Sequence, residues 1–94
     1  MAILVTAISP SMTAEQDDEM VRLLNLAGNP PAGALARLAG PAEGGWRILS
    51  VWESQEAWDA FRRERVEPAL RQAGLPSPQF QVAPLHSVRI NPQR

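Results

Sequence analysis

The chain has 94 residues, a formal net charge of −1, 45% hydrophobic and 20% charged residues. This is the length of one domain and the composition of a globular protein, since disordered chains carry less apolar content and more net charge. The weak charge, without a basic stripe, argues against nucleic acid as a partner. No apolar run reaches the roughly 18 residues of a membrane span, and the N-terminus does not resemble a signal peptide. We therefore expect a cytoplasmic protein that binds neither membranes nor nucleic acid.

The missing residue types exclude several chemistries. Cys, Tyr and Lys are absent, and all nine basic residues are Arg. A thiolate nucleophile, a disulfide, a phenolic acid and a lysine Schiff base are therefore excluded. The only histidine, His86, cannot form a multi-histidine metal site within one chain. We expect neither a metal site nor a cofactor.

The N-terminal third predicts a strand followed by a helix. Residues 2–8 form a short apolar, β-branched run that ends before Ser9-Pro10, as a buried strand would. Thr13 and Gln16 have the spacing of a capping box. The apolar spacing after them predicts a helix over 14–27, closed by Gly28.

Two further strands are expected in the middle of the chain. Residues 34–39, bracketed by glycines, predict a weak strand, and 41–45 a hairpin loop. Residues 46–53 predict the strongest strand. Alternation puts Trp46, Ile48, Ser50 and Trp52 on one face, and Arg47, Leu49, Val51 and Glu53 on the other.

A second helix should begin after Ser54, which is a good N-cap residue. It carries two apolar faces about 120° apart at 100° per residue. The first face consists of Ala57, Trp58 and Phe61, and the second of Val66, Ala69, Leu70 and Ala73. Pro68 cannot donate a backbone hydrogen bond, so we expect a kink or a break near 65–67. Residues 80–90 predict a last strand, with a bulge or edge position at Pro84.

The element order β-α-β-β-α-β predicts an α+β, ferredoxin-like domain over residues 1–90, followed by a tail at 91–94. Its four-stranded antiparallel sheet has apolar residues on both faces, whereas two helices cover only one. A homodimer, a dimeric α/β barrel, would cover the other. We expect the face of Trp46 and Trp52 to meet the second subunit, and the helices to cover Leu49 and Val51.

The run Gly45-Trp46-Arg47-Ile48-Leu49-Ser50-Val51-Trp52-Glu53-Ser54-Gln55-Glu56-Ala57-Trp58-Asp59-Ala60-Phe61 resembles the third strand and second helix of the antibiotic-biosynthesis-monooxygenase-like dimeric α/β barrel family. That family includes cofactor-free monooxygenases of aromatic polyketides, haem-degrading enzymes and many proteins without a known role. The overall resemblance is to bacterial members with a Trp-Glu-Ser motif, here Trp52-Glu53-Ser54, and a Pro-x-His motif near the C-terminus, here Pro84-Leu85-His86. The resemblance implies the fold more strongly than it implies an activity.

The chain departs from the active members of this family in its second helix. Many of them carry a histidine soon after the motif, where this chain has Phe61-Arg62-Arg63-Glu64-Arg65. The haem-degrading members also have a tryptophan near the position of Phe61. Haem oxygenation is therefore not expected.

The candidate ligand-binding residues are Trp52, Ile48, Ser50, Phe61, Trp46 and Arg37, and the candidate general base is His86. Each has a plainer alternative, namely ring packing, a surface ion pair or a surface histidine. Two functions stay open. One is an enzyme, a cofactor-independent monooxygenase or a related activity on a small aromatic or polyketide-like substrate. The other is a non-catalytic homodimer that binds a small hydrophobic or aromatic molecule or is purely structural.

Overall fold

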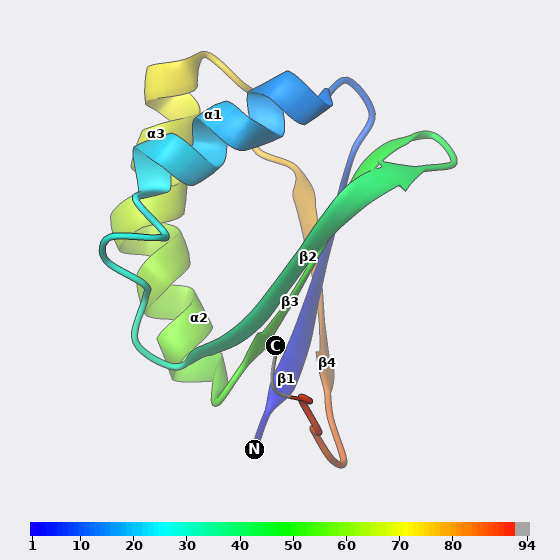
Figure 1. Ribbon diagram of the computed structural model, residues 1–94, viewed down its shortest axis with the longest axis vertical. Coiled ribbons are helices and arrows are strands. Elements are labelled where there is room, and N and C mark those ends of the chain that lie inside the picture. Colours follow the sequence, from blue (N-terminus) through cyan, green and yellow to red (C-terminus); the bar gives the residue numbers. More distant parts are fainter. Residues whose placement is uncertain (92–94) are drawn as a thin grey trace.

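The computed structural model describes residues 1–91 and confirms the ferredoxin-like α+β fold (Figure 1). Its elements are β1 (Ile3–Ser9), α1 (Ala14–Leu24), β2 (Ala34–Ala42), β3 (Gly45–Trp52), α2 (Gln55–Phe61), a π-helical turn (Arg62–Val66), α3 (Glu67–Ala73) and β4 (Gln79–Pro84). All strand pairs are antiparallel, in the order β2-β3-β1-β4.

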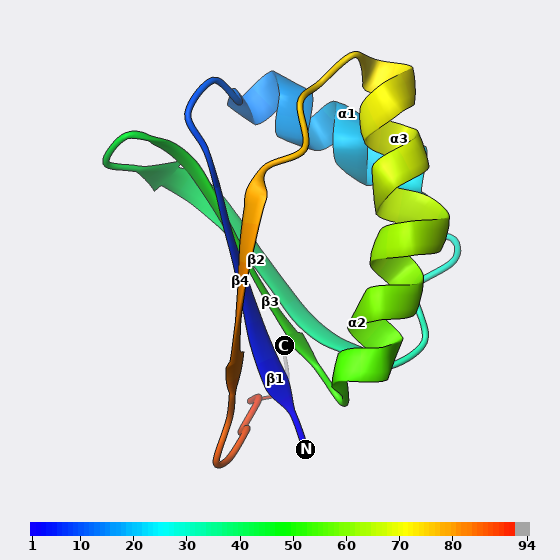
Figure 2. The same cartoon turned by 180° about the vertical axis from the view of Figure 1, so that it is seen from behind.

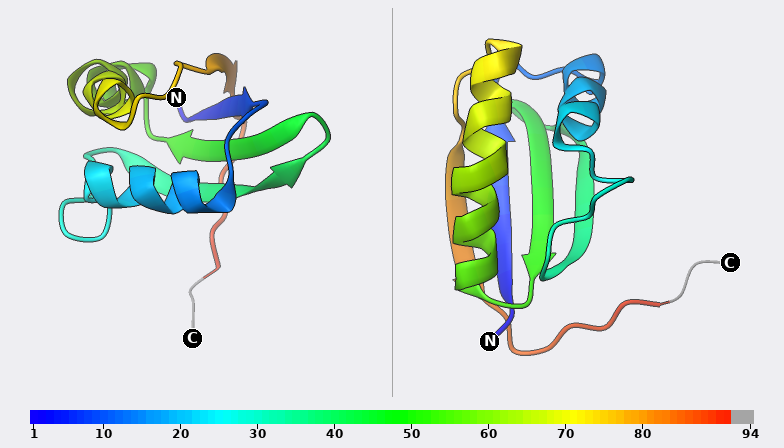
Figure 3. Two further views of the ribbon diagram at one scale, coloured as in Figure 1. Left: turned by 90° about the horizontal axis from the view of Figure 1, so that it is seen from above. Right: turned by 90° about the vertical axis from the view of Figure 1, so that its left-hand side faces the viewer.

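The molecule has two layers, because all helices lie on one face of the sheet (Figures 1 and 3). Viewed from the helical side, α2 and α3 lie over the β4 half of the sheet, and α1 lies over the β2 half (Figure 3, right). No helix covers the opposite face within residues 1–91. In the same range, no helix is long and apolar enough to cross a membrane.

The two sheet faces are the reverse of those expected. Strand register places Ser50 and Trp52 opposite Val5 and Ile3, and these residues face the helices. Trp52 is only 2% exposed within a single chain. The expectation that this face meets a second subunit is therefore wrong. Both faces are apolar, so alternation alone could not tell them apart; the large indole of Trp52 fills the space between the layers.

The first helix begins as predicted and ends earlier. The Gln16 amide donates to Thr13 Oγ1 (3.2 Å), and the Thr13 amide donates to Gln16 Oε1 (3.0 Å), so the capping box is present. The helix ends at Leu24, because Asn25 adopts the left-handed conformation (φ 51°) and its amide bonds back to Arg22. Asn is one of the residues that tolerates this conformation, so Gly28 is not needed to end the helix.

The second helix continues through Pro68 without a break (Figure 2). The expected irregularity is a π-helical turn that precedes the proline, in which the Glu67 amide donates to the Arg62 carbonyl, five residues back. A π turn holds one residue more than an α turn, so it takes up about 100° of rotation. That angle nearly cancels the offset between the two apolar faces. Trp58, Phe61, Val66 and Leu70 are consequently all buried against the sheet.

The strand ends differ from the predicted ones. Strand β2 runs on to Ala42, so the hairpin turn is shorter than 41–45. Strand β4 ends at Pro84 rather than at Ile90, since proline has no amide proton to continue the ladder. The Leu85 amide still bonds to the Ala2 carbonyl (2.9 Å). After it, the chain leaves the sheet and passes beneath its lower edge (Figure 3, right). Of the predicted tail, residues 92–94 lie outside the described residues.

Candidate functional site

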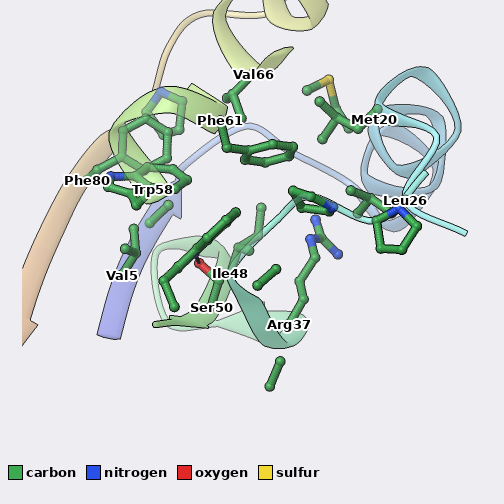
Figure 4. A pocket seen from close by; sticks show the side chains of 18 of the residues that line it. Val5, Met20, Leu26, Arg37, Ile48, Ser50, Trp58, Phe61, Val66 and Phe80 are labelled. Atoms are coloured by element: carbon green, nitrogen blue, oxygen red, sulfur yellow. Dashed lines mark hydrogen bonds between the residues drawn. The ribbon is translucent and has the colours of Figure 1, made fainter. Parts of the chain in front are cut away.

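A pocket of about 290 Å³ lies between the helical face of the sheet and the helices (Figure 4). Its floor comes from β1, β2 and β3, and its roof comes from the helices. The residues that line it include Val5, Arg37, Ile48, Ser50, Trp52, Trp58, Phe61, Met20, Val66 and Phe80. Most of these side chains are apolar, so the pocket suits a ligand that is largely apolar itself.

Four aromatic rings form one wall of the pocket. The Trp52 ring lies 5.6 Å from Trp58 and 5.2 Å from Phe61, and Trp58 meets Phe80 edge-on at 5.1 Å. Offset and edge-to-face contacts of this kind add to the stability that ring burial supplies. The four rings therefore pack as one cluster and present apolar surface to the cavity.

The polar groups of the pocket are few and adjacent. Arg37 on β2 lies directly opposite Ser50 on β3 in the strand register. Trp52 Nε1 donates to Ser50 Oγ (2.9 Å), which leaves the hydroxyl proton of Ser50 available for another acceptor. The sheet thus brings an arginine and a hydroxyl to one place on an apolar floor.

Arg37 is held by a carboxylate from the first helix. Its Nη2 donates to Asp17 Oδ1 (2.7 Å) and its Nη1 donates to Asp17 Oδ2 (3.4 Å). Asp17 is 6% exposed, whereas a quarter of the Arg37 side chain is accessible. This two-pronged pair ties α1 to β2 over the pocket and fixes the direction of the guanidinium.

Five of the seven candidate residues lie together in the pocket: Trp52, Ile48, Ser50, Phe61 and Arg37. The cavity lies within a single chain, whereas it was expected between two subunits. Trp46 is beside the hairpin, opposite Pro41 and Ser9, and does not line the cavity. Its Nε1 is buried without a hydrogen-bond partner among residues 1–91. His86 is exposed, follows β4 and does not line the cavity either.

Asp17 is the residue of this site that the sequence analysis missed. In sequence it is one of four acids near the start of a helix, where the helix dipole favours them. Only the packing of α1 against β2 separates it from its exposed neighbours. Within residues 1–91, no group of three His, Asp or Glu side chains could hold a metal ion.

No family model matches the chain, and no curated protein matches it. Solved structures do match. A protein of unknown function from Nitrosomonas europaea aligns with a TM-score of 0.67 and 19% identity, over 98% of this chain and 94% of that one. A candidate antibiotic biosynthesis monooxygenase from Chloroflexus aurantiacus aligns at 0.59 and 17%, over 96% and 98%.

A third structure is a mutant form of SnoaB, a cofactor-independent oxygenase from Streptomyces nogalater. It aligns with a TM-score of 0.59 and 12% identity, over 93% of each chain. The chain has the antibiotic-biosynthesis-monooxygenase-like fold. Identities of 12–19% establish this fold and no activity, because one fold hosts many functions.

Proposed function

We propose that the protein binds a small, largely apolar aromatic molecule in the pocket between the sheet and the helices. The observation that supports this most is the cavity itself, about 290 Å³, lined by aromatic rings and by two polar side chains, Arg37 and Ser50. Ligand sites have this character: mostly apolar walls with a few convergent polar groups that orient the ligand.

Titration calorimetry with 2-acetylnaphthalene tests this proposal. Ala34 lines the cavity, whereas Ala39 lies on the same strand outside it. We expect the wild-type protein and Ala39→Phe to bind the compound with similar affinity. Ala34→Phe should bind it at least about tenfold more weakly, because the ring occupies the ligand's space. Equal binding by the two variants would place the ligand elsewhere.

A more specific proposal is that the pocket performs a cofactor-independent oxygenation. The support is the fold it shares with SnoaB and the shape of the pocket. An anthrone-like substrate would supply all the electrons: its CH₂ group and O₂ would become a carbonyl and water. Trp52, Ile48 and Phe61 would orient the ring and exclude water, and Arg37 and Ser50 would donate hydrogen bonds to the carbonyl oxygen of the substrate.

Oxygen uptake with 1,8-dihydroxyanthrone separates this enzyme from a non-catalytic binding protein. A catalyst takes up oxygen faster than the uncatalysed solution, and one atom of ¹⁸O₂ enters the product. His86→Ala should keep the wild-type rate, because a general base must reach the proton it removes and His86 does not line the pocket. Binding without faster uptake would favour the non-catalytic alternative.

We further propose that a second copy of the chain covers the sheet face opposite the helices. That face carries an apolar patch, which we call the outer patch: Leu4, Ile8, Leu38, Leu49 and Val51. Ile8 and Leu38 are 47% and 57% exposed in the single chain. Arg47 is the one charged residue that the register places beside the patch, so the patch suits an equally apolar surface. The resemblance to dimeric barrels favours the same partner.

A further inference from the structure

The net charge of the polar corner in the pocket depends on Asp17. Arg37 brings a positive charge to the floor, and the Asp17 carboxylate, 2.7 Å away and 6% exposed, cancels it. We propose that Asp17 is a specificity-determining residue, which makes the pocket select neutral aromatic carbonyl compounds over aromatic carboxylates of the same shape. This inference rests on the proposed ligand-binding function.

The corner offers hydrogen-bond donors to a ligand. A guanidinium has five N–H groups, of which Asp17 takes two. The other three have no acceptor among residues 1–91. The Ser50 hydroxyl, whose oxygen already accepts from Trp52, can donate beside them. A carbonyl oxygen has two lone pairs and can accept from both residues.

A carboxylate ligand could also accept hydrogen bonds from these donors, but two electrostatic effects would lower its affinity. Its charge would lie beside the Asp17 carboxylate, and like charges repel strongly where water is excluded. Because the Arg37–Asp17 pair has no net charge, it cannot compensate for the water that the ligand's anion loses on entering an apolar pocket. A neutral ketone meets neither penalty.

Calorimetry with three compounds of nearly one shape tests this in the wild-type protein. They are 2-acetylnaphthalene, 2-naphthoate and 2-isopropenylnaphthalene, in which the ketone is replaced by a carboxylate or by an alkene. We expect the ketone to bind at least about tenfold more tightly than the carboxylate and severalfold more tightly than the alkene. Naphthoate that binds as tightly as the ketone would overturn the inference. If none of the three binds, the proposed function fails as well.

Asp17→Asn should abolish the preference for the ketone. The amide keeps the shape of the side chain and leaves Arg37 with its full charge. Naphthoate should then gain at least about tenfold in affinity, while the ketone changes less than about threefold. Glu19→Gln is the matched control, because Glu19 lies exposed on the same helix and pairs with Arg22. It changes the net charge equally and should leave both affinities unchanged. If Asp17→Asn leaves the ratio of affinities unchanged, Asp17 does not set specificity.

Discussion

At the scale of single residues, Trp52 connects the two layers. It is 2% exposed, contacts two aromatic rings from α2 and donates to Ser50. Replacing it with alanine leaves a cavity that the rigid surroundings fill poorly. We expect Trp52→Ala to lower the free energy of unfolding by about 3–5 kcal/mol, measured by denaturant unfolding at a fixed protein concentration.

Trp46→Ala is the control for this prediction. Trp46 is on the same strand and the same face but is less buried and has no partner for its indole nitrogen among residues 1–91. Its removal should cost clearly less stability than the loss of Trp52. A larger loss at Trp46 would mean that the hairpin end, and not the aromatic wall, holds the layers together.

The sequence predicted a good part of the site at this scale. Trp52, Ile48, Ser50 and Phe61 could be grouped because alternation along one strand and the following helix puts them near each other. Asp17 could not be found in this way, because its pairing with Arg37 depends on where α1 packs, twenty residues away in sequence. Trp46 and His86 are residue types that often line ligand sites, but neither of them lines this cavity.

At the scale of elements, the π-helical turn aligns two apolar faces that lie out of phase in the sequence of the second helix. Two apolar faces about 120° apart cannot both face the sheet from one straight α-helix, and the extra residue of the turn brings them into line. The phase difference could be predicted, and so could an irregularity near Pro68. Its form could not, because a kink and a π turn both satisfy the same pattern.

Two deletion variants test whether the π-helical turn brings the two apolar faces into line. Deleting exposed Glu64 in a Pro68→Ala background turns the π turn into an α turn and leaves both apolar faces in place. We expect that protein to keep its helical circular dichroism and its cooperative thermal transition. Deleting exposed Asp59 in the same background should abolish the transition, because it rotates Trp58 and Phe61 relative to each other by about 100°. Equal damage from both deletions would show that the turn does not set the phase.

At the scale of the whole molecule, the outer patch is the feature that one chain leaves uncovered. If a second copy covers it, the protein should sediment at micromolar concentration with twice its 10.3 kDa mass. Leu38→Asp places a charge in the patch and should give a monomer, because an unpaired buried charge is costly. Gln72→Asp, exposed on α3, should stay dimeric. A wild-type monomer would contradict the proposed dimer.

The fold at this scale was predictable because each element has a local signal, namely a cap, an alternating run or a turn residue. Which face of the sheet the helices cover could not be predicted from the sequence. Both faces carry apolar residues, so alternation predicts cover on both, but only the packing of Trp52 beneath the helices shows which face the helices cover.

An aromatic ligand is expected to enter the pocket between the sheet and the helices of a single chain. The three indole N–H signals in a ¹H–¹⁵N NMR spectrum test it most directly, because Trp52 and Trp58 line the pocket and Trp46 does not. Titration with 2-acetylnaphthalene should shift the Trp52 and Trp58 signals together and leave the Trp46 signal in place. A shift of Trp46 alone, or of no indole at saturating ligand, would contradict the account.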